Sequence, residues 1–275
     1  MKITIISCVL FLTAVTAFSQ TPMKTAAEAK LSASDLAVKI ADRILATTTY
    51  EFKNTKTGKT YKSVKNLPLD MNVKVACKYN NWHYTNGVTH IALMELADKT
   101  GAKKYDDYVL KNMNFVFNEG NLDFFKKQYD QAMKNEGWYG VRKLSWHMIF
   151  RGKRLDDNGP MGASLIDLQM KHPNNSFLNY INETAEHLNY GEPRLADGTI
   201  ARIWPHENTI WADDAFMAIS FLARMAKMTG DMSYINDAAN QVIKYHKYLW
   251  CPEKRILYHC YHTEDRKRTR LNSSH

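Results

Sequence analysis

Hydrophobic residues recur at helical spacing along most of the chain, in units that repeat. In each of three units, two apolar residues three positions apart are followed by a third apolar or aromatic residue at a constant spacing. Between the second and the third of these residues stand helix-ending pairs such as Thr100-Gly101 and Thr229-Gly230. Each unit therefore predicts an apolar helix, a short turn and a second helix. The recurring positions are Leu93, Leu96 and Tyr105; Leu165, Leu168 and Phe177; and Leu222, Met225 and Tyr234.

The two helices of a unit differ in character. The segment Ala215–Met228 has only Ser220, Arg224 and Lys227 as polar interruptions, which predicts a helix buried on most sides. The segment Ser233–Trp250 is amphipathic, as expected of a helix that covers it from outside. An inner helix paired with an outer one, repeated, indicates an all-α toroid of helical hairpins. An open helical solenoid has the same pattern, and periodicity alone does not close the ring.

The remaining segments surround these units. A first helix is predicted over Ala33–Thr48, and the polar stretch Glu51–Asp70 is predicted to be a loop. The stretch Glu136–Leu155 interrupts the helical rhythm and is predicted to form a loop or hairpin. No linker rich in Pro, Gly or Ser divides residues 20–263, so we expect them to form one domain.

The N-terminus has the pattern of an export signal. Lys2 precedes the apolar run Ile3–Phe18, and Ala17-Phe18-Ser19 supplies small residues where a signal peptidase would cut. The run is short for a membrane span. We therefore expect residues 1–19 to be a signal peptide and the mature protein to be periplasmic or secreted, without a membrane partner.

The C-terminus breaks the pattern abruptly. The stretch "DRKRTRLNSSH", Asp265–His275, resembles the in-frame translation of a sequencing adapter, and residues 264–275 are expected to be a non-native tail. The stretch carries +3 of the formal charge of +9. The remaining excess is ordinary for a protein surface, and no basic block interleaved with aromatic residues predicts a nucleic-acid partner.

Cysteine usage predicts neither a disulfide framework nor a metal site. Behind the signal stand an odd number of cysteines, Cys77, Cys251 and Cys260. The segment Cys251–His262 contains further histidines, but no Cys-x-x-Cys or His-Glu-x-x-His spacing accompanies them. We expect no metal and no cofactor.

Adjacent acids stand in front of two of the apolar helices. Asp156 and Asp157 precede one, and Asp213 and Asp214 precede the other, near the same helix end. One interpretation is capping, since Asp is favoured at helix N-termini. The other is a pair of carboxylates that face one cavity and act as acid and base. Doubled acids favour the second interpretation, as do neighbouring aromatic and histidine residues and two glycines expected to thin the cavity mouth: Trp204, His206, Trp211, Gly159 and Gly162.

Four motifs in one order resemble a known family. The chain resembles the unsaturated rhamnogalacturonyl hydrolases of glycoside hydrolase family 105, which are close relatives of the unsaturated glucuronyl hydrolases of family 88. The resemblance implies an (α/α)6 barrel, incomplete here because the last hairpins and a later Arg/Trp-rich motif have no counterpart before the tail. The motifs are "WHYTNGV" (Trp82–Val88), "DNGPMGASL" (Asp157–Leu165), "WADDAFM" (Trp211–Met217) and "RILYHCYH" (Arg255–His262).

The resemblance also implies roles for individual residues. Asp213 falls at the general acid and Asp157 at the assisting carboxylate, while Asp156 and Asp214 are expected to be capping or supporting acids. His206 stands in for a family histidine that has no clear match. The residues expected to bind substrate are Tyr84, Trp82, Trp211, His259, His206 and Met217.

The implied substrate is an oligosaccharide that ends in a 4,5-unsaturated uronic acid. Asp213 would protonate C4 of the enol ether, water would add at C5, and the hemiketal would release the sugar. Two alternatives stay open: the same chemistry on glycosaminoglycan fragments, and a non-catalytic helical carbohydrate-binding or scaffold protein. The last predicts that Asp157 and Asp213 lie far apart or serve as simple caps.

Overall fold

The computed structural model describes residues 32–117, 120–151, 154–265 and 267–269. The chain divides into two compact units, residues 1–43 and 44–275. Helix α2 (Ala33–Thr47) spans the boundary and confirms the first predicted helix to within one residue. The predicted signal peptide lies outside the described residues. Of the helices in the described part, none is at once long and apolar enough to cross a membrane.

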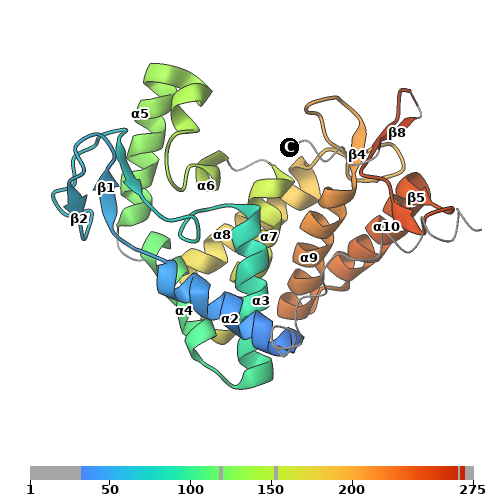
Figure 1. The fold of residues 1–275 in the computed structure, drawn as a ribbon. Helices are drawn as coiled ribbons and strands as arrows, with labels where there is room; N and C mark the ends of the chain where they lie inside the picture. The colour runs from blue at the N-terminus through green and yellow to red at the C-terminus, as the bar shows by residue number, and fades with distance from the viewer. Residues whose placement is uncertain (1–31, 118–119, 152–153, 266, 270–275) are drawn as a thin grey trace, which may run out of the picture. The chain divides into compact units, whose positions relative to one another are not determined.

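Three helical hairpins form the centre of the second unit and confirm the predicted repeat. The first helix of each hairpin packs beside the first helix of the next, in the order α3, α7, α9, and each second helix packs on its own partner (Figure 1). Leu93, Leu165 and Leu222, the repeated apolar residues, are at most 3% exposed. The hairpins are α3 (Tyr84–Thr100) with α4 (Lys104–Phe117), α7 (Leu155–Lys171) with α8 (Asn175–Glu186), and α9 (Ala212–Thr229) with α10 (Met232–Leu249).

The predicted helix ends are confirmed at two hairpin turns. Gly101 and Gly230 adopt left-handed backbone angles, with φ of 71° and 76°. Their N–H groups donate to the carbonyl oxygens of Ala97 and Ala226, which would otherwise lack partners at the helix end. Both turns are therefore built by the residue type that tolerates them best.

Glycines let the inner helices approach closely at the end that carries the acids. A methyl group on Gly87 of α3 would collide with the backbone of Pro160 and Met161 in α7, and one on Gly159 of α7 would collide with the backbone of Met217 in α9. Gly159 is buried between helices, as is Gly162. The expectation that these two glycines thin the mouth of a cavity is therefore wrong.

Substituting Gly159 by alanine is expected to destabilise the protein by about 1–3 kcal/mol, because α7 and α9 would have to move apart to admit the methyl group. Thermal unfolding followed by circular dichroism measures this. Met170→Ala, at a more exposed position of the same helix, is the control and should change the melting temperature less. Equal melting temperatures for the two variants would refute the close contact.

The segment predicted as a polar loop contains two short strands. Strands β1 (Phe52–Asn54) and β2 (Thr60–Tyr61) pair antiparallel, and β1 also pairs with β3 (Val73–Val75). The prediction of a loop over Glu51–Asp70 is thus wrong for these strands. The reason is that Phe52 is fully buried among other aromatic side chains, although the residues around it are polar.

The predicted loop or hairpin over Glu136–Leu155 is also largely wrong. Helix α5 (Asn121–Val141) runs into this segment, and a short helix α6 (Met148–Arg151) follows. Gly137 has non-helical angles, φ 59° and ψ −150°, and kinks α5. A helical turn follows this kink, and it buries Val141, which packs with Ala132. The rhythm of polar and apolar residues breaks at Gly137, where the first helical part of α5 also ends.

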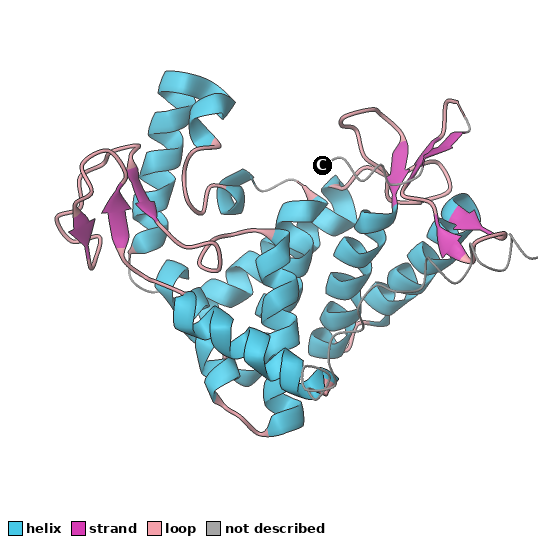
Figure 2. Cartoon of the chain, in the orientation of Figure 1, coloured by secondary structure: helices cyan, strands magenta, loops and turns pink. Residues whose placement is uncertain are grey.

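Short strands follow and precede the last hairpin (Figure 2). Strand β4 (Thr209–Trp211) pairs with β7 (Cys260–His262), which pairs with β8 (Lys267–Thr269), while β5 (Trp250–Cys251) pairs with β6 (Ile256–Leu257). The fold is nevertheless mainly helical, as predicted. The assignment of residues 264–275 as a non-native tail stays a prediction.

Candidate active site

The start of α9 brings together three residues predicted for the site. Strand β4 leads into α9, and its pairing with β7 places Trp211 opposite Cys260. The N–H of Ala212 donates to the carbonyl oxygen of His259 at 2.8 Å. The side chain of His259 therefore lies beside α9, with Nε2 3.1 Å from Oδ2 of Asp213, and its ring meets the Trp211 ring edge-on at a centroid distance of 4.9 Å.

Asp213 is the accessible member of this cluster. Its side chain is 47% exposed, whereas that of His259 is 15% exposed. A carboxyl group that reaches solvent and lies against an imidazole has the geometry for proton transfer to a bound molecule. The prediction that Asp213 and His259 belong to one site agrees with this geometry, although their catalytic and binding roles stay predictions.

The neighbouring acid, Asp214, is buried and held by an arginine that the sequence analysis missed. Arg202 donates to both carboxylate oxygens of Asp214, at 2.7 and 2.6 Å, and to Asp156 at 3.1 Å. Its guanidinium also lies 4.6 Å from the centroid of the Trp211 ring. Arg202 thus links the N-terminal turns of α7 and α9 and supports the tryptophan that contacts His259.

Capping does not explain these acids. The N-cap residues of α7 and α9 are Arg154 and Trp211, and neither makes a side-chain cap hydrogen bond. Asp156 and Asp214 bind Arg202 instead. The contact with Arg202 is compatible with the expectation that Asp156 and Asp214 support the site. Neither acid is the N-cap residue of its helix, as the capping interpretation would require.

Burial dominates the electrostatics of the Arg202 cluster. It raises the pKa of Asp214 to about 6, against the opposing attraction of Arg202, and the charges of Asp156 and Asp213 add to the shift. Desolvation acts against the charged guanidinium of Arg202, but its hydrogen bonds to Asp214 raise its pKa above the usual range. The cluster is a buried ion network with more acid than base.

Asp157 is buried too, behind a different arginine. Its side chain is 1% exposed and both of its oxygens accept hydrogen bonds from Arg151. Desolvation raises its pKa, and the Arg151 guanidinium opposes the shift. Trp82 is fully buried and donates its indole N–H to the Asp157 carbonyl oxygen at 2.7 Å. The structure therefore places Trp82 behind Asp157, and the predicted contacts of both residues with substrate stay untested.

The other predicted residues have separate surroundings. Tyr84 begins α3, is 39% exposed and stacks near His83 at 4.5 Å. Met217 is buried, with its backbone against Gly159 of α7. The ring of His206 lies 5.6 Å from that of His262. These contacts do not join the three residues to the cluster around Asp213.

A pocket of about 270 Å³ adjoins the Arg202 cluster. Asp156 and Asp214 line it, rather than the predicted Asp157 and Asp213. Its other polar or aromatic lining residues are Arg154, His187, Glu192, Arg202 and Trp204. Of these five, only Trp204 was singled out from the sequence.

Glu192 and His187 form a pair in the pocket wall. Nε2 of His187 lies 2.9 Å from Oε2 of Glu192, across the π-helical turn η1 (His187–Gly191). Burial raises the pKa of Glu192 to about 7, and the negative charge of Asp214 adds to the shift. A single-turn π-helix has no hydrophobic periodicity of its own, so this pair could not be predicted from a sequence pattern.

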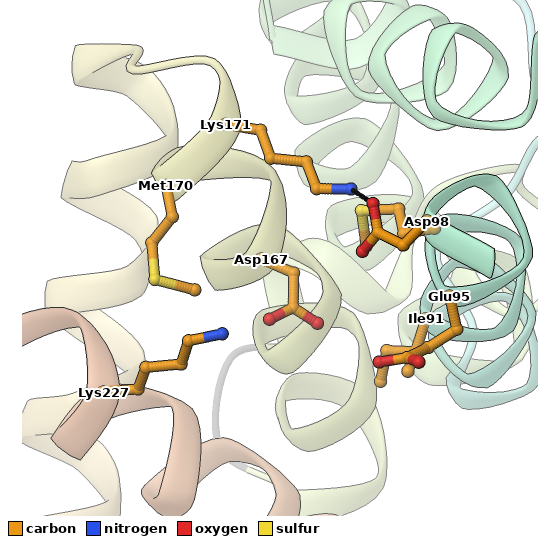
Figure 3. A pocket seen from close by; sticks show the side chains of 8 residues that line it. Ile91, Glu95, Asp98, Asp167, Met170, Lys171 and Lys227 are labelled. Atoms are coloured by element: carbon orange, nitrogen blue, oxygen red, sulfur yellow. Dashed lines mark hydrogen bonds and ion pairs between the residues drawn. The ribbon is translucent and has the colours of Figure 1, made fainter. Parts of the chain in front are cut away.

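A second pocket, of about 230 Å³, lies at the opposite ends of the inner helices (Figure 3). Charged side chains from α3, α7 and α9 surround it, and Lys171 donates to Asp98 at 2.8 Å. Asp167 is engaged by Arg224 at 2.7 Å. Among the residues that the structure describes, no aromatic side chain lines this pocket, and it lies away from the residues predicted for chemistry.

Comparison with known proteins agrees with the motifs. The structure is similar to that of a possible GH105 member from Klebsiella pneumoniae, with a TM-score of 0.54, 13% identity, and coverage of 87% of this chain and 54% of that one. It is also similar to a family 105 glycoside hydrolase from C. acetobutylicum, with a TM-score of 0.52, 21% identity, and coverage of 85% and 50%.

The chain thus spans about half of the length of these structures, and at such identities the likeness concerns the fold. It supports the predicted fold of helical hairpins found in six-hairpin glycosidases. No curated protein matches the chain. A family model, that of Glycosyl Hydrolase Family 88, matches residues 56–274, which is most of the sequence. Three of the four motifs lie at the starts of adjacent inner helices and the fourth on strands β6 and β7, and this chain belongs to glycosyl hydrolase family 88.

Proposed function

We propose that this protein removes the terminal 4,5-unsaturated galacturonic acid from rhamnogalacturonan oligosaccharides made by polysaccharide lyases. The observation that carries this proposal is the contact of Asp213 with His259 and of His259 with Trp211, at the open end of α9. An accessible carboxyl beside an imidazole and an indole suits a sugar whose double bond must be protonated. Family membership supports the reaction class.

Asp213 is the proton donor in this proposal. It gives its proton to C4 of the enol ether, and positive charge develops at C5 and the ring oxygen. Water adds at C5 and gives up a proton, which His259 accepts, and the resulting hemiketal opens and expels the sugar on the other side of the glycosidic bond. His259, 3.1 Å from the carboxyl oxygen, is positioned to return a proton to Asp213 for the next turnover.

The buried acids stabilise the developing charge from a distance. Asp157 and Asp214 are fixed by Arg151 and Arg202, so their orientation requires no rearrangement during the reaction. Asp157 would help to position the water in the arrangement that the family resemblance implies. We further propose that the enzyme acts outside the cytoplasm, which rests on the export pattern of residues 1–19.

Lyase digests test this proposal. The purified protein is incubated with rhamnogalacturonan and chondroitin lyase digests, and the loss of absorbance of the conjugated uronate is followed. Faster loss with the rhamnogalacturonan digest is expected. Faster loss with the chondroitin digest would establish the glycosaminoglycan alternative. No loss with either would leave a non-catalytic carbohydrate-binding protein.

A further inference from the structure

The kink in α5 is explained neither by the packing of the helical hairpins nor by the proposed reaction. Gly137 has φ 59° and ψ −150°, a combination that glycine alone adopts without strain. The next residue is Trp138, and the guanidinium carbon of Arg151 lies 5.3 Å from the centroid of its ring. Trp138 is 38% exposed, so burial in a core does not account for its position. A backbone outlier of this kind points to a role for the side chain that it places.

Arg151 connects this tryptophan to the buried acid at the start of α7. Its guanidinium donates to both carboxylate oxygens of Asp157, with 2.6 Å between Nη2 and Oδ1. The Arg151 side chain is 18% exposed, and that of Asp157 is 1% exposed. A tryptophan ring is the best aromatic partner for a cation, and its contact adds to the paired hydrogen bonds in fixing the guanidinium.

The charge of Asp157 depends on Arg151. Burial raises the pKa of Asp157, and the hydrogen bonds and the charge of Arg151 oppose the shift. Neighbouring charges on α7 act in both directions, since Asp156 adds to the shift and Arg154 opposes it. Tyr180 of the outer helix α8 adds no charge, because burial raises its pKa above the usual range of a phenol. Without Arg151, burial would dominate, and Asp157 would hold a proton near neutral pH.

Two histidines near Arg151 do not replace it as the cation. Burial lowers the pKa of His83, the N-cap residue of α3, and also that of His147, and the charge of Arg151 adds to both shifts. Both imidazoles are therefore neutral near neutral pH. The ring of His147 meets that of Trp138 edge-on, with 5.8 Å between centroids, so it packs on the tryptophan. The cation that compensates Asp157 is thus Arg151, supplied by α6.

We propose that Arg151 is a positioning residue that keeps Asp157 in its carboxylate form, and that the kink at Gly137 places Trp138 to hold Arg151 there. The proposal rests on the proposed function and deepens it, because a charged Asp157 is what positions the water and stabilises the positive charge at C5. Arg151 acts through Asp157 and not on the substrate.

The first test needs no turnover, so its outcome is independent of the proposed function. Melting temperatures of the parent, Arg151→Met and the double variant Arg151→Met/Asp157→Asn are compared at about pH 7.5 and at about pH 4.5. Arg151→Met is expected to melt about 10 °C below the parent at the higher pH, because a buried carboxylate is left without its cation.

This deficit should shrink at the lower pH. In Arg151→Met the pKa of Asp157 in the folded protein stands further above that in the unfolded chain than it does in the parent. As the pH falls, the folded variant therefore takes up a proton first and gains stability relative to the parent. Asp157→Asn in the same chain removes the charge and should restore most of the loss at the higher pH.

Two results of this test would overturn the proposal. A deficit that is equal at both pH values, or that Asp157→Asn does not reduce, would mean that Arg151 only fills space. If Arg151→Met does not fold at the higher pH, folding of the double variant there supports the proposal, and failure of both variants to fold contradicts it.

Trp138→Ala tests the part assigned to the kink. It should lower the melting temperature more at the higher pH than at the lower one, by a smaller amount than Arg151→Met does. Tyr139→Ala is the matched control, because Tyr139 is the next residue, is 73% exposed and has Nζ of Lys143 4.3 Å from its ring centroid. This control should show no dependence on pH. The same pH dependence in both variants would refute the role of the kink.

The pH profile of turnover distinguishes positioning from a general loss of structure. With an unsaturated disaccharide, the acid limb of kcat/KM is expected to move to higher pH by at least about one unit in Arg151→Met. It should move less in Arg151→Lys, which keeps the charge but not the paired hydrogen bonds. A uniform fall of kcat/KM at all pH values would count against the proposal. Absence of turnover in the parent would contradict the proposed function, whereas the melting temperatures would still decide the role of Arg151.

Discussion

Asp213→Asn is expected to lower kcat on the unsaturated substrate by about 100- to 10,000-fold, the range in which positioned acids and bases contribute. An amide has nearly the size of the carboxyl but carries no proton that it can give to C4. Because Asp213 is 47% exposed, and the hydrogen bonds of Arg202 go to Asp214 and Asp156, the variant should fold as the parent does. Initial rates of absorbance loss measure the effect.

The matched control is Asp98→Asn. Asp98 is also exposed, with a side chain 62% accessible, and it lines the pocket at the other ends of the helices. Its replacement should leave kcat within about twofold. If Asp213→Asn kept more than about a tenth of the parental kcat, Asp213 would not be the proton donor.

Arg202→Met is expected to destabilise the protein by about 3–5 kcal/mol. It would leave Asp214, which is almost fully buried, without the cation that compensates its charge. It would also remove the support under Trp211. Chemical denaturation of the parent and the variant gives the change in the free energy of unfolding.

Two further variants make this measurement specific. Lys126→Met breaks the exposed ion pair between Lys126 and Asp130, whose side chains are 51% and 58% accessible. This variant should change the free energy of unfolding by less than about 1 kcal/mol. The double variant Arg202→Met/Asp214→Asn removes the uncompensated charge and should recover part of the loss. A loss in Arg202→Met no larger than that in Lys126→Met would contradict the role given to the Arg202 network.

Periodic features of the fold were predictable, and irregular ones were not. The spacing of Leu93, Leu165 and Leu222 revealed three hairpins, because burial on an inner helix imposes that spacing. The stretch Glu136–Leu155 was predicted as a loop or hairpin because its rhythm is interrupted, but a helical turn follows Gly137 and the short helix α6 follows later. The strand β1 was missed because Phe52 is its only apolar residue and stands among polar neighbours.

The residues of the candidate site also include some that the sequence predicts and some that it does not. The family resemblance of the motif "WADDAFM" pointed to Asp213, and that of "RILYHCYH" pointed to His259, which the pairing of β4 and β7 brings beside Asp213. Arg202 stands in an unremarkable stretch of sequence. It matters because of Asp156 and Asp214, and the contact with Asp156 arises only when α7 and α9 pack together. Such a residue is recognised from its tertiary partners, which no local pattern contains.

In the proposed mechanism the chemistry takes place at the C4=C5 double bond and not at the anomeric carbon. The most direct test compares cleavage of an unsaturated-uronate disaccharide with cleavage of its saturated counterpart, which has the same sugars and linkage. Release of the second sugar is quantified by chromatography for both. We expect release from the unsaturated disaccharide alone. Release from the saturated disaccharide at a comparable rate would contradict it and indicate ordinary glycoside hydrolysis.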